Sequence, residues 1–172
     1  MVRDALSADA KSIAKVHVAS WQEAYIDLMP ADFLDSLVKT LQQRATYWAS
    51  AIESQEAEVL VADIEGSVVG WISIGPCRDE DRAAEEFGEV MAIYLLPEYW
   101  GKGIGTELWK SGLKRLSDQG CRFITLWVLS KNERAIRFYQ RLGAVEDSNS
   151  HRTLVRGGIV LDEVRYILSI KA

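Results

Sequence analysis

Cysteine, proline and histidine are scarce in this chain of 172 residues, and their scarcity excludes several classes of protein. The two cysteines, Cys77 and Cys121, stand far apart, with no CxxC pair and no histidine at ligand spacing. This pattern argues against a disulfide framework and a zinc site, and predicts two reduced thiols and no bound metal. With 3 prolines and 12 glycines, neither a collagen-like chain nor extended disorder is expected.

Long apolar runs and basic clusters are missing too. The longest uncharged stretch includes Ser67 to Cys77 and is much shorter than the roughly 20 apolar residues that span a bilayer. Charged residues from Arg3 onward leave no apolar segment for a signal peptide. The formal net charge of −5, without a basic patch, argues against nucleic-acid binding. We therefore expect a cytoplasmic protein that binds neither a membrane nor nucleic acid.

What the sequence does contain is typical of a folded domain, with 48% hydrophobic and 26% charged residues. The length predicts a single domain over residues 1–172. Apolar periodicity and turn residues predict strands at 1–6, 57–64, 68–74, 88–96, 122–129, 144–155 and 159–169, and helices at 9–25, 30–53, 104–119 and 132–142. The resulting order, β-α-α-β-β-β-α-β-α-β-β, predicts an α/β fold with a mixed central sheet.

An acidic stretch at 78–86 precedes the central strand and has two interpretations. It is either a solvated loop or one wall of a site for a cationic substrate. In the second case the carboxylates of Asp79, Asp81, Glu85 and Glu86 would face that substrate.

The segment that carries the most chemistry is a strand, a glycine-rich loop and a helix. Glycines 101, 103 and 105 let the backbone approach a ligand closely, and a helix N-terminus favours a bound phosphate. A Walker loop needs Ser or Thr after its lysine, but Gly103 follows Lys102. The dinucleotide fingerprint also fails, because Thr106 or Leu108 stands where a glycine is required. A pyrophosphate cradle for coenzyme A fits the loop.

At this loop the sequence resembles the GCN5-related N-acetyltransferase (GNAT) family. Its [QR]-x-x-G-x-[GA] signature is matched from Trp100 to Gly105, except that Trp100 replaces Gln or Arg. A second motif, an Asn-headed helix bearing a tyrosine, is matched from Asn132 to Gly143. The order of elements also agrees, so the resemblance covers nearly the whole chain. It implies a sheet whose middle strands splay apart and are flanked by helices.

The resemblance implies an acetyl-CoA-dependent transfer of an acetyl group to a primary amine within a ternary complex. Acetyl-CoA would lie along the central strand, the loop and the second motif, and the N–H of Leu95 or a neighbour would polarise the thioester carbonyl. The expected cofactor-binding residues are Ile93, Tyr94, Leu95, Trp100, Gly101, Lys102, Gly103, Ile104, Gly105, Thr106, Asn132 and Tyr139.

Two residues are candidates for proton transfer. Glu89 stands where several family members carry a catalytic glutamate, and it is either the base for the amine or a solvent-facing carboxylate at a strand end. Tyr139 occupies the family's general-acid position and would protonate the departing thiolate, unless it is only a core aromatic. Asn132 is a helix cap with or without a contact to the pantetheine.

The N-terminal helices form the acceptor side in this family, so Trp21 and Tyr25 are expected to bind the substrate. Trp71 and Glu89 are the other expected substrate-binding residues. A polyamine, a peptide N-terminus or an amine antibiotic would suit such a site. A homodimer is left open. The alternative is a non-catalytic acyl-CoA-binding regulatory module of the same fold, which Trp100 favours and which Glu89 and Tyr139 oppose.

Overall fold

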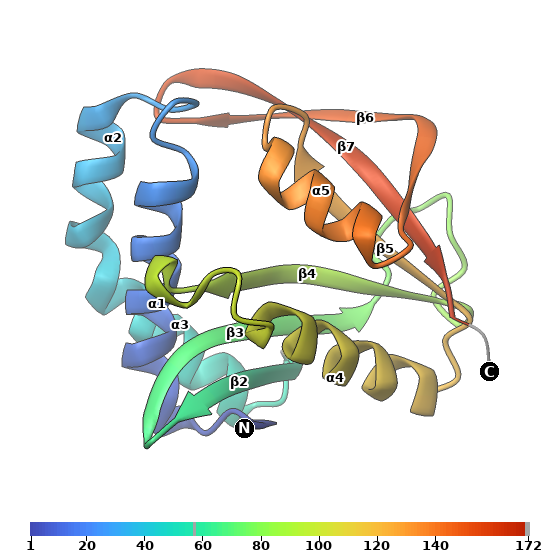
Figure 1. Ribbon diagram of the computed structural model, residues 1–172, viewed down its shortest axis with the longest axis horizontal. Coiled ribbons are helices and arrows are strands. Elements are labelled where there is room, and N and C mark those ends of the chain that lie inside the picture. The colour runs from blue at the N-terminus through green and yellow to red at the C-terminus, as the bar shows by residue number, and fades with distance from the viewer. Residues whose placement is uncertain (57, 171–172) are drawn as a thin grey trace.

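A computed structural model describes residues 1–56 and 58–170. Within this part of the chain, seven strands form one sheet in the order β1-β2-β3-β4-β5-β7-β6 (Figure 1). Only β4 and β5 are parallel, and every other neighbouring pair is antiparallel. The strands are β1 (Val2–Asp4), β2 (Glu58–Ile64), β3 (Ser67–Pro76), β4 (Phe87–Leu95), β5 (Phe123–Leu129), β6 (Val145–Arg156) and β7 (Ile159–Ser169).

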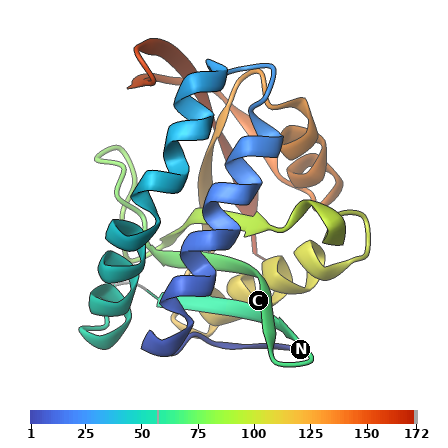
Figure 2. The ribbon, with the colours of Figure 1, turned by 90° about the vertical axis from the view of Figure 1, so that its left-hand side faces the viewer.

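Helices cover both faces of this sheet (Figure 2). They are α1 (Ala10–Ala24), α2 (Ala31–Ser36), α3 (Leu41–Glu53), α4 (Ile104–Asp118) and α5 (Glu133–Arg141). The alternation of side chains along β2 shows the two faces. Val59 and Val61 pack with α1 and α3, whereas Leu60 and Ala62 pack with α4.

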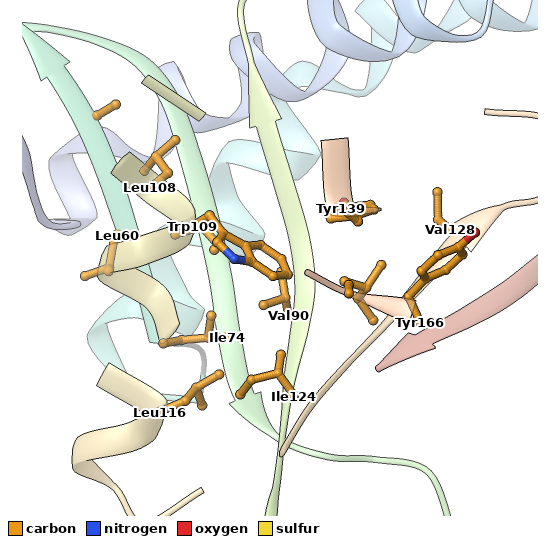
Figure 3. Close-up of a cluster of buried hydrophobic side chains, with 14 of the residues drawn as sticks. Leu60, Ile74, Val90, Leu108, Trp109, Leu116, Ile124, Val128, Tyr139 and Tyr166 are labelled. Atoms are coloured by element: carbon orange, nitrogen blue, oxygen red, sulfur yellow. The ribbon is translucent and has the colours of Figure 1, made fainter. Parts of the chain in front are cut away.

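The largest core lies between the sheet and the helices α4 and α5 (Figure 3). From α4, Leu108 and Leu116 are fully buried, and Trp109 is 2% exposed. The indole of Trp109 reaches the ring of Tyr139 on α5, with the two centroids 5.5 Å apart. Each large apolar side chain buried in this way contributes roughly 1.5–3 kcal/mol to folding. Tyr139 is therefore held in place by core packing.

The middle of the sheet opens into a fork. β4 and β5 pair only from Phe87 to Glu89, opposite Phe123 to Thr125, and then diverge. Gly88 in this paired segment lets α4 pack closely on the sheet, because a Cβ there would lie 2.9 Å from a Leu116 methyl carbon. On its other edge β4 carries a bulge at Met91, where its register with β3 slips. The splayed middle strands that the sequence predicted are confirmed.

One predicted helix is interrupted. The segment expected to be helical over 30–53 divides into α2, a 3₁₀ turn at Leu37–Thr40 (η2) and α3. The Thr40 hydroxyl donates to the Leu37 carbonyl at 2.6 Å, a local bond that favours the tighter turn. The turn shifts the phase of the apolar stripe, so Val38 is 51% exposed rather than part of the core. Ala57, where the second predicted strand begins, lies outside the described residues.

Candidate active site

A cleft of about 630 Å³ occupies the fork between β4 and β5. Its walls come from β4, β5, α1, α5 and the β6–β7 hairpin. Most of the residues that the sequence singled out line it: Glu89, Ile93, Tyr94, Leu95, Trp100, Gly101, Gly103, Gly105, Thr106, Asn132, Tyr139, Trp21 and Tyr25. Residues distant in sequence are thus brought to one place by the divergence of two strands.

Three predicted residues do not line the cleft. The Lys102 ammonium lies 5.2 Å from the centre of the Tyr99 ring, and Ile104 packs against the main core. Trp71 is fully buried, with its ring 4.8 Å from that of Trp48. The expected contact between Trp71 and an acceptor is therefore corrected: a large aromatic on an inward-facing strand position serves the core.

The glycine loop forms one end of the cleft. We call this the loop end and define it by Gly101, Gly103, Gly105, Thr106 and Asn132. Gly101 and Gly103 have φ values of 74° and 84°, which side chains with a Cβ rarely adopt. A Cβ on either glycine would meet nothing within 4 Å, so open space lies before the backbone. The first N–H groups of α4 have no acceptor within the helix, and such groups favour a bound anion.

The backbone of β4 presents a second set of polar groups to the cleft. The N–H of Leu96 donates to the Val69 carbonyl of β3 at 2.9 Å. Peptide groups alternate in direction along a strand, so those of Ile93 and Leu95 point the other way, into the fork. An extended ligand can pair with this edge as an added strand would.

Trp100 contributes to the wall beside that edge. Its indole N–H donates to the Leu95 carbonyl at 2.8 Å, and the Ser20 hydroxyl donates to the same oxygen at 2.9 Å. The guanidinium carbon of Arg134 lies 3.2 Å from the centre of the Trp100 ring. The residue that departs from the family signature therefore fixes the end of β4 and supports an arginine.

Sequence reasoning missed two cationic residues here. Arg134 and Arg141 both line the cleft, and burial lowers the pKa of Arg134. Together with Arg137, they recur on α5 at positions three and four residues apart, so they lie along one side of the helix. That spacing is the signal that would have found them.

Tyr139 and Asn132 approach the cleft from α5 and from the loop before it. The Asn132 side chain accepts the Ala135 N–H at 3.2 Å, so its role as a helix cap is confirmed. Tyr139 is 8% exposed. Burial raises the pKa of its phenol well above the usual value, which keeps the group protonated and able to donate.

Glu89 lies at the base of the fork and is 2% exposed. Its Oε1 accepts from Nη2 of Arg78 at 2.6 Å, and its Oε2 accepts from Nε at 3.0 Å and from the Arg78 backbone N–H at 3.1 Å. The hydrogen bond to Glu89 raises the pKa of Arg78. The interpretation of Glu89 as a solvent-facing carboxylate is therefore wrong.

The acidic stretch is not a wall for a cationic substrate. Arg165, which is 4% exposed, donates to Asp79 at 3.1 Å and to Asp81 at 2.7 Å. The hydrogen bond from Arg165 lowers the pKa of Asp81 to about 2. The indole N–H of Trp127 also donates to Asp79, at 3.1 Å. No carboxylate of residues 78–86 lines the cleft, because the protein's own cations bind Asp79 and Asp81.

The opposite end of the cleft, which we call the hairpin end, is formed by Arg78, Trp127, Arg152, Leu161 and Glu163. Leu161 packs in one cluster with residues of α1 and α2. Side chains two positions apart on a strand share a face, so Glu163 lies on that face too. The loop end, in contrast, belongs to the face covered by α4 and α5. The cleft therefore connects the two faces of the sheet.

Two further observations concern the described residues only. They contain no group of three or more His, Cys, Asp or Glu side chains that could hold a metal ion, and both Cys77 and Cys121 are free. Their helices are too short or too polar to cross a membrane.

Comparison with known proteins identifies the family. The sequence profile of the Acetyltransferase (GNAT) family matches residues 15–144, more than half of the chain. The chain belongs to the GNAT family. It is 38% identical over 139 residues to YuaI, an uncharacterised N-acetyltransferase of Bacillus subtilis strain 168, covering 81% of this chain and 76% of that protein. The GNAT chain is thus an acyltransferase of the N-acetyltransferase type.

Solved GNAT structures share the fold. A putative acetyltransferase, yncA, from Salmonella typhimurium with its cofactor acetyl-CoA aligns with a TM-score of 0.74 at 22% identity, covering 100% of this chain and 94% of that one. The paia N-acetyltransferase from Thermoplasma acidophilum, in complex with coenzyme A, aligns with a TM-score of 0.72 at 18% identity, covering 99% and 98%.

Proposed function

We propose that this protein transfers an acetyl group from acetyl-CoA directly to a primary amine of a small molecule or peptide, within a ternary complex. The observation that carries the proposal is the cleft at the fork. It collects an open strand edge, a glycine loop at a helix N-terminus, a buried carboxylate and a buried phenol.

The loop end fits the cofactor. The free N–H groups at the start of α4, with Arg134 and Arg141 at the cleft wall, would hold phosphates. The pantetheine would pair with the backbone of Ile93 and Leu95, and a backbone N–H of β4 nearer to Glu89 would polarise the carbonyl of the thioester. Acetyl-CoA, when bound, supplies the activated acetyl group that the amine attacks.

The chain's own side chains would move two protons. Glu89, directly or through water, takes the proton that the amine loses as its nitrogen–carbon bond forms. Tyr139 donates its phenolic proton to the sulfur as the carbon–sulfur bond breaks. Arg78 holds the Glu89 carboxylate in a fixed orientation through three hydrogen bonds. The acceptor amine must therefore approach the side of that carboxylate that faces the cleft and not Arg78.

The test is to mix the protein with acetyl-CoA and a panel of amines, follow release of free CoA thiol, and identify products by mass spectrometry. We expect CoA release that depends on an amine and a product heavier by one acetyl group. Acetyl-CoA binding without CoA release from any amine would contradict the proposal and favour the non-catalytic acyl-CoA-binding module.

Removing one hydroxyl sharpens this test. Tyr139→Phe should lower kcat by roughly 10- to 10³-fold while the KM for acetyl-CoA hardly changes. Tyr166→Phe is the matched control: Tyr166 is also buried, but its hydroxyl contacts Gln140 and Glu146, and it does not line the cleft. Full activity of the Tyr139 variant would remove the general-acid role.

A further inference from the structure

The hairpin end of the cleft carries two arginines that point to the identity of the acceptor. Arg78 and Arg152 both line the cleft, and their side chains are 61% and 45% exposed. The carboxylates they bind are covered, since the side chains of Glu89 and Glu163 are only 2% and 15% exposed. At this end the cations are therefore more accessible than the anions.

Neither arginine is saturated by its carboxylate. A guanidinium has five N–H donors. Arg152 uses Nε to donate to Glu163 at 2.7 Å, and its Nη1 and Nη2 make no hydrogen bond with the side chains and backbone that the structure describes. Arg78 uses Nε and Nη2 for Glu89, and its Nη1 likewise has no acceptor there. Donors for an anion are thus available at this end of the cleft, and each of the two carboxylates already has a cationic partner.

Arg152 is also held in position. Its guanidinium carbon lies 4.2 Å from the centre of the Trp127 ring, and Trp127 is anchored by its N–H bond to Asp79. A guanidinium that is stacked on an aromatic ring and held at one edge is pre-organised to bind a carboxylate through its remaining edge.

We infer that the acceptor is an amine that also bears a carboxylate, with Arg152 on Trp127 binding that carboxylate. This inference rests on the proposed acetyl transfer and narrows its substrate class. The amine would lie toward Glu89 at the base of the fork, and the carboxylate toward the hairpin. Polyamines fit poorly, because Asp79 and Asp81 bind Arg165 instead and neither Glu85 nor Glu86 lines the cleft.

The test uses pairs of acceptors that differ by one carboxylate: ornithine with putrescine, lysine with cadaverine, and phenylalanine with phenethylamine. For at least one pair, we expect kcat/KM for the carboxylate-bearing member to be at least about tenfold higher. In Arg152→Gln this preference should fall about tenfold or more, while the amine without a carboxylate changes less than about twofold. Calorimetry with CoA-saturated protein should show the same loss of carboxylate binding.

Arg122→Gln is the control, because Arg122 is 72% exposed, pairs with Glu86 and lies outside the cleft. An unchanged rise in melting temperature with acetyl-CoA would show that the Arg152 variant is folded. The inference is overturned if the carboxylate-free members are acetylated equally well or better, or if Arg152→Gln slows both members of a pair alike. Absence of CoA release with every acceptor would instead overturn the transfer activity itself, and the inference with it.

Discussion

The two ends of the cleft differ in the chemical groups that line them. The loop end is mostly main chain: peptide N–H groups at the start of α4, glycines in left-handed conformations, and the open edge of β4. The hairpin end is mostly charged and aromatic side chains, contributed by β5, β6, β7 and the residue that follows Cys77.

This difference has consequences for how each end responds to substitution. Main-chain donors tolerate changes of side chain but not of backbone conformation, so the loop end should depend on its glycines. Charged side chains in a partly buried site depend on their partners, and removal of one member leaves the other uncompensated. The hairpin end should therefore be more sensitive to charge and to pH than the loop end.

The largest effect on stability is expected at Arg165, which binds the carboxylate that anchors Trp127. Arg165→Met leaves Asp79 and Asp147, with side chains 13% and 19% exposed, short of a partner. We expect the free energy of unfolding to fall by about 3–5 kcal/mol, measured by urea denaturation without ligand. Arg137→Met is the control, since its exposed pair with Glu133 should contribute at most about 0.5 kcal/mol.

The ion pairs of Arg165 also predict how acid changes the stability of the fold. The hydrogen bond from Arg165 lowers the pKa of Asp81 from 3.8 to about 2 in the folded protein. The stabilisation is therefore complete above pH about 4 and is lost as the pH falls toward 2. The Arg165 variant should lose less stability than the unsubstituted protein over this interval. Parallel losses in both proteins would show that other groups control the acid response.

At the loop end, Gly103→Val should abolish acetyl-CoA binding, because its φ of 84° does not suit a branched residue. Acetyl-CoA at about 100 times its Kd should stabilise the unsubstituted protein by about 2.7 kcal/mol, and the variant should show no such shift in melting temperature. Gly120→Val is matched, with a φ of 95° and open space around it, but lies at the other end of α4. Equal losses of acetyl-CoA binding in both variants would show that backbone strain alone causes the loss.

Glu89→Gln tests the proposed base, which lies between the two ends of the cleft. We expect kcat/KM to fall by up to about 10²-fold near neutral pH and to recover partly at high pH, where more of the amine is already deprotonated. A pH–rate profile measures this. An equal deficit at every pH would assign Glu89 to acceptor binding or to structure, and leave water or another group as the base.

The smallest effect is expected from Trp100→Phe, which keeps a ring beneath Arg134 but removes the N–H that donates to Leu95. One hydrogen bond of this kind contributes about 1 kcal/mol, so the Kd for acetyl-CoA, measured by calorimetry, should rise by at most about fivefold. Trp100→Gln separates the two roles, since it retains an N–H donor and loses the ring. Unchanged affinity for acetyl-CoA in the Phe variant would mean that Trp100 acts only through its contact with Arg134.

The contrast between the ends also explains what the sequence predicted. Left-handed turns favour glycine, so the loop end leaves a local pattern at 101 and 103, and Asn132 and Tyr139 follow in a second local motif. The element order and the fork were predictable with them. The hairpin end has no such pattern, because Trp127 and Arg152 meet only through the pairing of β5 and β6 with β7.

The errors have the same origin. The acidic stretch was left with two interpretations, a solvated loop or a wall for a cationic substrate, because a sequence does not show which carboxylates a buried cation such as Arg165 will bind. Trp71 was expected near the acceptor, but its side chain points into the core. A shift of one residue along a strand exchanges the two faces, and the sequence alone does not show which face Trp71 occupies. Arg134 was overlooked although its helix carries a regular row of arginines.

The path of the cleft through the sheet bears on the order in which substrates bind. Its loop end lies on the face covered by α4 and α5, and its hairpin end on the face that packs with α1 and α2. Two molecules that enter from opposite faces do not block each other, so neither has to bind first. In steady-state kinetics, double-reciprocal plots at several fixed concentrations of one substrate should intersect, and an unreactive analogue of the amine should inhibit noncompetitively rather than uncompetitively against acetyl-CoA.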